Sequence, residues 1–137
     1  TDRIFKESNT AKQAQAKLEQ EFSKREKELN DSGNALKTAV EKFEREAPTL
    51  SESQRLARQK QLGEQDRDFQ RKRREFQEEL NARKNEEMQQ VVERINRVIK
   101  QLGDAEKYDL IVENALYINP KHDITDKVIK TINATAK

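Results

Sequence analysis

Two runs of apolar residues at helical spacing, separated by one proline, constrain this chain more than any other feature. In the first run, from about Thr10 to Ala47, the apolar side chains form one narrow seam along the helix. Most of the remaining positions carry Lys, Glu, Gln or Arg, which are strong helix formers. A narrow seam close to a 3.5-residue period is typical of a coiled coil rather than of a helix in a globular core.

Pro48 separates the two runs, because the residue before a proline is pushed out of the α region. A capping box is then expected to open a second helix, formed either by Thr49 with Glu52 or by Ser51 with Gln54. The two boxes lie two residues apart, so the boundary of the second helix is left open between them.

The second run extends from about Leu50 to Leu102, and Gly103 is expected to cap its C-terminal end. Because the loop between the runs is very short, the two helices should lie side by side and antiparallel. The sequence therefore predicts a long helical hairpin with its tip near residues 47–51. In such a hairpin, positions that sum to about 97 face each other, so Phe22 is expected to face the region of Glu75–Phe76, and Leu29 the region of Asp68–Phe69.

The predicted seam is apolar on both helices, although Arg25 and Ser32 interrupt it and Gly33 weakens the first helix. Towards the base of the hairpin the stripe on the second helix continues through Met88, Val91, Ile95, Val98 and Leu102. The residues expected to hold the arm together are Leu18, Phe22, Leu29, Leu36, Phe43, Leu62, Phe69, Phe76 and Leu80.

After Gly103 the period of the pattern changes. Tyr108, Leu110 and Val112 alternate with other residues at strand spacing, and a second short apolar run covers residues 115–118. Asp123 is then expected to cap a final helix over residues 124–134. Two short strands alone are not stable in water, so these need another strand or another subunit.

The apolar residues are concentrated in residues 91–132, which predicts a thin arm on a compact base. Residues 11–88 are expected to form the arm, and residues 1–10 and 89–137 the base. Because the sequence opens at Thr1 rather than at a methionine, we expect a processed or trimmed chain without a signal peptide.

Composition argues against several classes of function. The chain has no cysteine, so neither a disulfide framework nor thiolate chemistry nor a Cys-based zinc site is expected. Acidic and basic residues are evenly mixed, with a net charge of only +2, whereas a nucleic-acid-binding protein usually shows a one-sided basic block. The sequence contains no run of apolar residues long enough to span a membrane.

Residues suited to catalysis are sparse. His122, the only histidine, lies in a polar turn and has no second ligand or nucleophile at a useful spacing. The acidic pairs Glu78–Glu79 and Glu86–Glu87 would need a desolvated pocket to act as acid and base, and slender charged helices do not offer one. The chain is therefore not expected to be an enzyme or to hold a metal or other cofactor.

The densest basic run comprises Arg71, Lys72, Arg73 and Arg74. Four consecutive helical residues point around most of the circumference, so the run is a weak nucleic-acid motif and is expected to form an exposed, salt-bridged surface. As an alternative, it forms a basic zone that contacts anionic clients or lipid head groups.

The C-terminal segment resembles the Skp/OmpH family of periplasmic chaperones. The resemblance rests on Tyr108 to Glu113, on Ala115 to Ile118, and on Asp123-Ile124-Thr125 with Val128 following. The opening Asp2 to Phe5, followed by a helix rich in Lys, Gln and Glu, is similar to the stretch after that family's first strand. The likeness covers essentially the whole chain in order.

The resemblance implies a mostly α fold with a small β part. A long antiparallel helical hairpin, or coiled-coil arm, would project from a small β-barrel body that is completed by homotrimerisation. The family's first strand would precede residue 1. Residues expected in the trimer body are Ile4, Phe5, Tyr108, Leu110, Val112, Leu116 and Ile118.

The resemblance also implies the function. Such proteins hold unfolded outer-membrane proteins between their arms without ATP, in the periplasm of Gram-negative bacteria, and a role in binding lipopolysaccharide is reported within the family. A purely structural coiled coil that spaces or tethers other proteins is one alternative. A prefoldin-like cytosolic chaperone subunit is another, although its strands lie between the two helices rather than after them.

Overall fold

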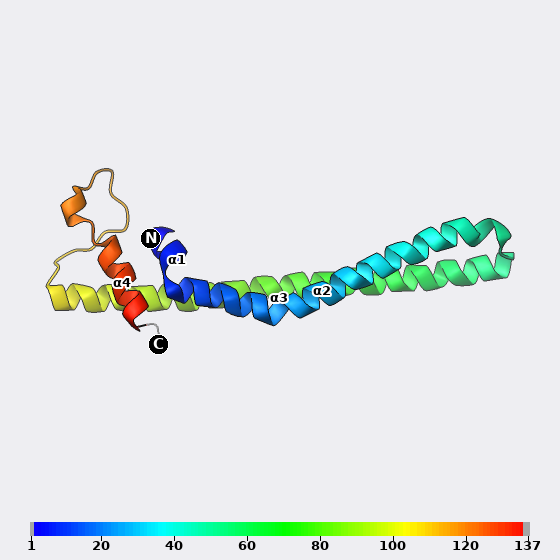
Figure 1. Cartoon of the computed structure of the whole chain (residues 1–137), viewed down its shortest axis with the longest axis horizontal. Helices are drawn as coiled ribbons and strands as arrows, with labels where there is room; N and C mark the ends of the chain where they lie inside the picture. Colours follow the sequence, from blue (N-terminus) through cyan, green and yellow to red (C-terminus); the bar gives the residue numbers. More distant parts are fainter. Residues whose placement is uncertain (1, 136–137) are drawn as a thin grey trace. The chain divides into compact units, whose positions relative to one another are not determined.

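A computed structural model describes residues 2–135 of the chain. Its elements in order are α1 (Asp2–Glu7), α2 (Asn9–Glu46), η1 (Ala47–Thr49), α3 (Glu52–Glu106), η2 (Pro120–His122) and α4 (Thr125–Thr135), as drawn in Figure 1. They divide into two compact units. The base unit comprises Thr1–Glu19 and Arg83–Lys137, and the hairpin unit comprises Gln20–Ala82.

The hairpin unit consists of two antiparallel helical stretches that contact each other along a seam (Figure 1). The rings of Phe22 and Phe76 meet edge to face, with their centroids 5.7 Å apart, which is the expected pairing. The Phe69 ring lies close against Gly33, one turn after Leu29 on α2: a Cβ added to the glycine would be 3.0 Å from Phe69 Cζ.

The tip of the hairpin follows the second of the two expected capping boxes. The Ser51 N–H donates to Gln54 Oε1 at 3.1 Å, and the Gln54 N–H donates to Ser51 Oγ at 3.3 Å. The Thr49 box is wrong, because the Thr49 hydroxyl instead donates back to the Glu46 carbonyl at 2.7 Å. That bond completes the short 3₁₀ turn through Pro48, so Thr49 closes the first helix instead of opening the next.

In the base unit, α4 covers one apolar stripe of α3. The core comprises Ile4, Val91, Ile95, Val98, Leu102, Val128, Ile129 and Ile132, with Phe5, Ala11, Ala14, Ile99 and Ile124 packed against it. Ile132 is fully buried and Val128 is 2% exposed. This spacing on α4 places one face of the helix on the core, while its other residues face outward.

The buried stripe on α3 begins at Glu87 and not at Met88. Met88 was expected in the stripe, but it is 54% exposed, whereas Glu87 is 5% exposed. Glu87 precedes Val91 and Ile95 at four-residue intervals and therefore lies on their face of the helix. Its carboxylate is tolerated there because it pairs with Lys17 and Arg83.

The predicted end of the second helix is also wrong. Gly103 remains helical, and α3 continues to Glu106. Lys107 adopts the left-handed conformation, with φ of 54°, and the Tyr108 N–H donates to the Gly103 carbonyl at 3.0 Å. This is the Schellman arrangement, which satisfies one of the last carbonyl groups of the helix. Ile111 Cδ1 lies 3.4 Å from the position that a Cβ on Gly103 would take, so the glycine accommodates that side chain.

The strands predicted at residues 108–112 and 115–118 are not formed in the part of the chain that the structure describes. In this same part, residues 109–118 take no part in a backbone–backbone hydrogen bond. A strand is stable only when its N–H and C=O groups find a neighbouring edge, and two short strands do not supply enough pairing by themselves. The prediction of two strands is therefore wrong for this chain by itself.

Candidate functional site

The largest concentration of exposed apolar residues lies in residues 108–118, which we call the apolar segment. Leu116 is fully exposed, Tyr117 is 83% exposed and Leu110 is 77% exposed. Val112, Ile118 and Tyr108 are also exposed, whereas Ile111 is half-buried. A contiguous apolar surface of this kind, on a backbone without internal hydrogen bonds, is typical of an interaction site.

The predicted body residues do not come together in this chain. Ile4 is buried in the core of the base unit and Phe5 packs against it, while Tyr108, Leu110, Val112, Leu116 and Ile118 are exposed. The structure thus separates them into two groups: Ile4 and Phe5 on α1, which are buried and half-buried, and an exposed set on the apolar segment.

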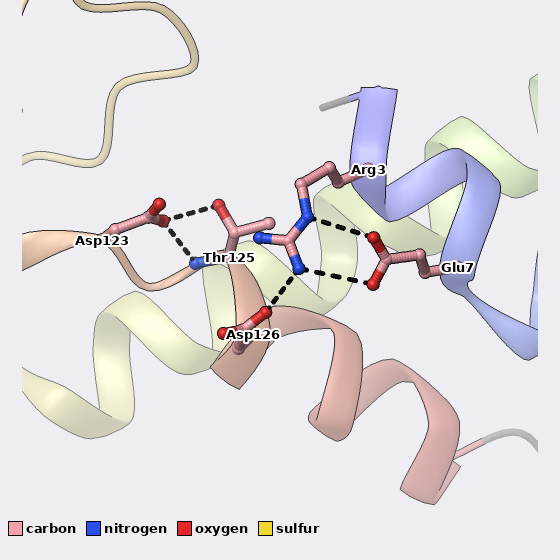
Figure 2. Close-up of polar contacts among 5 residues, drawn as sticks. All are labelled: Arg3, Glu7, Asp123, Thr125 and Asp126. Carbon is pink, nitrogen blue, oxygen red and sulfur yellow. Dashed lines mark hydrogen bonds and ion pairs between the residues drawn. The ribbon is translucent and has the colours of Figure 1, made fainter. Parts of the chain in front are cut away.

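α4 is held at its N-terminal end by polar contacts that Figure 2 shows. The Asp123 carboxylate accepts from the Thr125 hydroxyl at 2.6 Å and from its N–H at 2.9 Å, and both bonds lower the pKa of Asp123. These bonds supply the cap that the sequence predicts for the final helix. Arg3 of α1 donates to Glu7 at 3.0 Å and to Asp126 of α4 at 2.8 Å (Figure 2).

A second polar contact holds α4 against the start of α2. The Asn9 N–H, at the start of α2, donates to Asn133 Oδ1 of α4 at 2.8 Å. Glu7 and then Asp126 raise the pKa of Arg3, which keeps the guanidinium charged. The side chains of Arg3, Glu7 and Asp126 are solvent-exposed, so their ion pairs contribute little to stability and serve mainly to orient α4.

Glu87, which was expected on a solvent-exposed helix face together with Glu86, is instead a buried carboxylate. Its Oε1 accepts from Lys17 Nζ at 2.6 Å and from Arg83 Nη2 at 2.8 Å. The Lys17 and then the Arg83 hydrogen bond lower its pKa, so it is ionised at neutral pH. The four-residue step from Glu87 to Val91 was the signal that could have found it, because it places both side chains on one face of the helix.

A groove of about 620 Å³ adjoins this ion cluster in the base unit. It runs between the first turns of α2 and the last part of α3, and Thr10, Lys17, Glu87, Arg94 and Arg97 are among its lining residues. The lining carries both signs of charge, and Lys17 and Glu87 already neutralise each other. The charges that line the groove therefore do not select a ligand of either sign.

The basic run on the hairpin is only partly salt-bridged. Arg71 pairs with Asp68 and Glu75, and Lys72 Nζ lies 2.9 Å from Asp68 Oδ2. Both cations lower the pKa of Asp68, Lys72 more than Arg71. Arg73 and Arg74 have neither an ion pair nor a side-chain hydrogen bond within the described residues, and they line a shallow groove of about 350 Å³ together with Gln70, Gln77, Glu78 and Asn81.

The seam residues differ in burial. Phe22 is 3% exposed, and the others are half-buried: Leu18, Leu29, Leu36, Phe43, Leu62, Phe69, Phe76 and Leu80. Arg25, which interrupts the seam in the sequence, lies over both rings of the Phe22–Phe76 pair, with Cζ 5.6 Å and 5.9 Å from their centroids. Its Nη2 donates to Glu79 Oε2 at 2.7 Å, so the interruption is itself packed and paired.

His122 is exposed in η2, and no group of three or more His, Asp or Glu side chains within residues 2–135 is arranged to hold a metal ion. None of the described helices combines the length and the apolar character needed to cross a membrane.

Comparison with known proteins identifies the family. A family model described as outer membrane protein (OmpH-like) matches residues 1–132. The chain belongs to the OmpH-like family. The resemblance inferred from the apolar segment and the final helix is therefore confirmed.

Relatives of this OmpH-like protein include the chaperone protein Skp of Yersinia enterocolitica, which is 29% identical over 132 residues, covering 95% of this chain and 80% of the relative. The chaperone protein Skp of Photorhabdus luminescens is 30% identical over 125 residues, covering 89% and 76%. Both relatives are named as chaperones rather than as enzymes.

The fold is shared with a solved structure. The crystal structure of an OmpH-like protein from Caulobacter crescentus matches with a TM-score of 0.84 at 23% identity, and the match covers 98% of this chain and 80% of that one. At this level of identity the likeness concerns the fold alone.

Proposed function

We propose that this protein is an ATP-independent holdase chaperone, which binds unfolded outer-membrane β-barrel proteins and prevents their aggregation. The observation that carries the proposal is the family match over residues 1–132, because it includes both the hairpin and the base. Its relatives named chaperone protein Skp cover most of the chain in the same way.

The protein acts as a homotrimer in this proposal. The apolar segment exposes Leu110, Val112, Leu116 and Ile118, and residues 109–118 have no backbone partner within the described chain. Strands from three copies would pair these backbone groups and bury these side chains in a shared β-barrel body. The body would place three hairpins around one cavity.

The hairpins form the walls of that cavity. Their apolar residues are largely used within the seam, where Phe22 and Phe76 contact each other, and the outer positions are mostly charged or amide-bearing. Such walls offer a client many weak contacts and no deep apolar pocket. Weak, multiple contacts hold an unfolded chain through avidity and still release it without an energy source.

A basic site for anionic groups is a further part of the proposal. Of the four residues in the basic run, Arg73 and Arg74 have no ion pair or side-chain hydrogen bond within the described residues, so they are the two that can contact an acidic client segment, an anionic lipid or lipopolysaccharide. Arg71 and Lys72 are occupied by Asp68 and Glu75.

The periplasm of a Gram-negative bacterium is the compartment that fits this activity, because clients on their way to the outer membrane pass through it. A chain without cysteine tolerates an oxidising compartment.

The test is an aggregation assay without nucleotide. An unfolded outer-membrane β-barrel protein is diluted from urea in the presence of the purified protein, and light scattering is followed while sedimentation reports the oligomeric state. We expect suppression of scattering at equimolar trimer. No suppression at that ratio would overturn the proposed activity.

Two leucine variants separate assembly from general loss of structure. Leu110 and Leu56 are both exposed, at 77% and 59%, but only Leu110 lies in the apolar segment. Leu110→Asp should abolish the trimer and the holdase activity, because three buried carboxylates would meet in the body. Leu56→Asp, on the hairpin, should leave the trimer intact. Equal sedimentation of the two variants would argue against assembly through the apolar segment.

A further inference from the structure

Two charged residues stand at the unfavourable ends of their helices in the base unit. Glu106 is the last residue of α3, where the partial negative charge of the helix end repels a carboxylate, and Lys127 lies in the first turn of α4, where the partial positive charge repels an ammonium group. The two side chains pair with each other: Lys127 Nζ lies 3.1 Å from Glu106 Oε2. Each charge thus offsets the unfavourable position of the other.

The same lysine also contacts the first residue of the apolar segment. Its Nζ lies 3.5 Å from the Tyr108 hydroxyl and 6.0 Å from the centre of the Tyr108 ring. Glu106 and then Tyr108 raise the pKa of Lys127, so the ammonium group stays charged. Tyr108 is accordingly the least exposed of the exposed apolar residues in the segment, at 38%.

These contacts join the two ends of the connection between α3 and α4. The connection covers residues 107–124, which is long for a segment that forms only the short η2 turn. Closing its ends reduces the number of conformations open to the apolar segment between them. A segment that is partly ordered in advance loses less entropy when it pairs with another chain.

We propose that Lys127 is a positioning residue for self-association: its contacts with Glu106 and Tyr108 hold the apolar segment ready to pair with a second copy of this chain. The inference rests on the proposed assembly. A second copy is the occupant that the segment fits, because residues 109–118 leave their backbone groups unpaired and Tyr108, Leu110 and Val112 alternate as in a strand.

The test compares two lysines of α4 in the full chain. Lys127→Met keeps the length of the side chain but removes the charge. Lys130→Met is the matched control, because Lys130 is exposed one turn further along and has no polar partner among the described residues. Sedimentation equilibrium gives the trimer association constant of each variant over a range of salt concentrations.

Loss of one exposed ion pair is expected to weaken assembly by about twofold to fourfold for each protomer. Because the trimer contains three such pairs, the overall association constant of Lys127→Met should fall by about 10-fold to 60-fold relative to Lys130→Met. Raising the salt concentration should lower the association constant of the wild type more than that of Lys127→Met. Only the wild type contains the Lys127–Glu106 ion pair, which salt screens. A lysine that merely stabilised α4 would lower the melting temperature without changing this salt dependence.

A charge exchange provides the rescue. Lys127→Glu combined with Glu106→Lys restores an attractive pair and places both charges at favourable helix ends, so at least half of the lost association energy should return. An association constant for Lys127→Met equal to that of Lys130→Met would overturn the inference while leaving the proposed assembly intact. A wild type that stays monomeric at all concentrations would overturn both.

Discussion

Replacing Gly33 by alanine sets two effects of comparable size against each other within the hairpin unit. A glycine in the middle of a helix costs about 0.8–1 kcal/mol relative to alanine, so the substitution should stabilise α2 by that amount if nothing else changed. At Gly33, however, the new Cβ would lie 3.0 Å from Phe69 Cζ and 3.2 Å from Phe69 Cε2. Carbon atoms pack favourably at about 3.5–4.0 Å, so the ring must move.

The energetic cost of moving the Phe69 ring decides whether Gly33→Ala raises or lowers the free energy of unfolding. Overpacking a well-packed site typically costs about 1–3 kcal/mol. Phe69 is half-buried, which allows some movement and places the cost near the lower end of that range. The net effect of Gly33→Ala should therefore lie between no change and a loss of about 1 kcal/mol in the free energy of unfolding.

Gly63 provides the matched control, because it lies in the same unit, on α3, and a Cβ there would have no atom within 4 Å. Gly63→Ala should gain the full value of about 1 kcal/mol. The two variants are then expected to differ by about 1–2 kcal/mol in urea denaturation followed by circular dichroism at 222 nm and at one fixed protein concentration.

A double-mutant cycle assigns the difference to the ring. Phe69→Leu removes the ring atoms that the new methyl group would meet, so Gly33→Ala should be more favourable by about 1 kcal/mol in the Phe69→Leu background than in the wild type. The reasoning is refuted if Gly33→Ala and Gly63→Ala stabilise the protein equally, because the ring would then not be held against Gly33.

Three further predictions concern the capping, the buried ion cluster and the buried hydroxyl. In the same urea assay, Ser51→Ala should destabilise the protein by about 1 kcal/mol, because Ser51 caps α3. Thr49→Ala should destabilise it less, and an equal loss for both variants would contradict the capping assignment. Glu87→Gln should destabilise the protein by about 1 kcal/mol at pH 7. The folded-state pKa of Glu87 is lowered from its ordinary value of 4.5, so this stability is present above pH 4.5 and is lost as the pH falls through the lower folded value. A difference between wild type and Glu87→Gln that does not shrink as the pH falls below 4.5 would count against the ion cluster. Thr10→Val should stabilise the protein by about 1 kcal/mol in thermal unfolding, because the buried Thr10 hydroxyl has no hydrogen-bond partner among the described residues, whereas a loss of stability would show that it has one.

Local patterns in the sequence predicted the helices well. Pro48 and the Ser51–Gln54 box placed the turn because both act within a few residues, through sterics and one pair of hydrogen bonds. The choice between the two boxes could not be made from sequence, since the Thr49 hydroxyl could either accept from the Glu52 N–H or donate to the Glu46 carbonyl. The predicted C-cap at Gly103 is wrong. A glycine can take the left-handed conformation that ends a helix, but in this chain Lys107 takes it.

The helical phase of the buried stripe was less predictable. Met88 is the better apolar candidate by residue type, and Glu87 is buried only because Lys17 approaches from α2 and Arg83 lies four residues before it on α3. The ion pairs of Arg71 and Lys72 with Asp68 and Glu75 join residues three or four positions apart, so the spacing along the helix predicts them. Arg74 also has an acidic residue, Glu78, four positions later, and only the structure showed that the two form no ion pair within the described residues.

By itself, the sequence determined two long helices, an antiparallel hairpin, a capped last helix and the OmpH-like family, all of which rest on spacing that is visible along the chain. Only the tertiary structure decided that Phe69 lies against Gly33, that a glutamate occupies the core stripe, and that the alternating residues after Tyr108 form no strand in this chain. The reason is common to all three. Each depends on which atoms lie across from the residue, and residues 109–118 have no backbone partner across from them within the described residues.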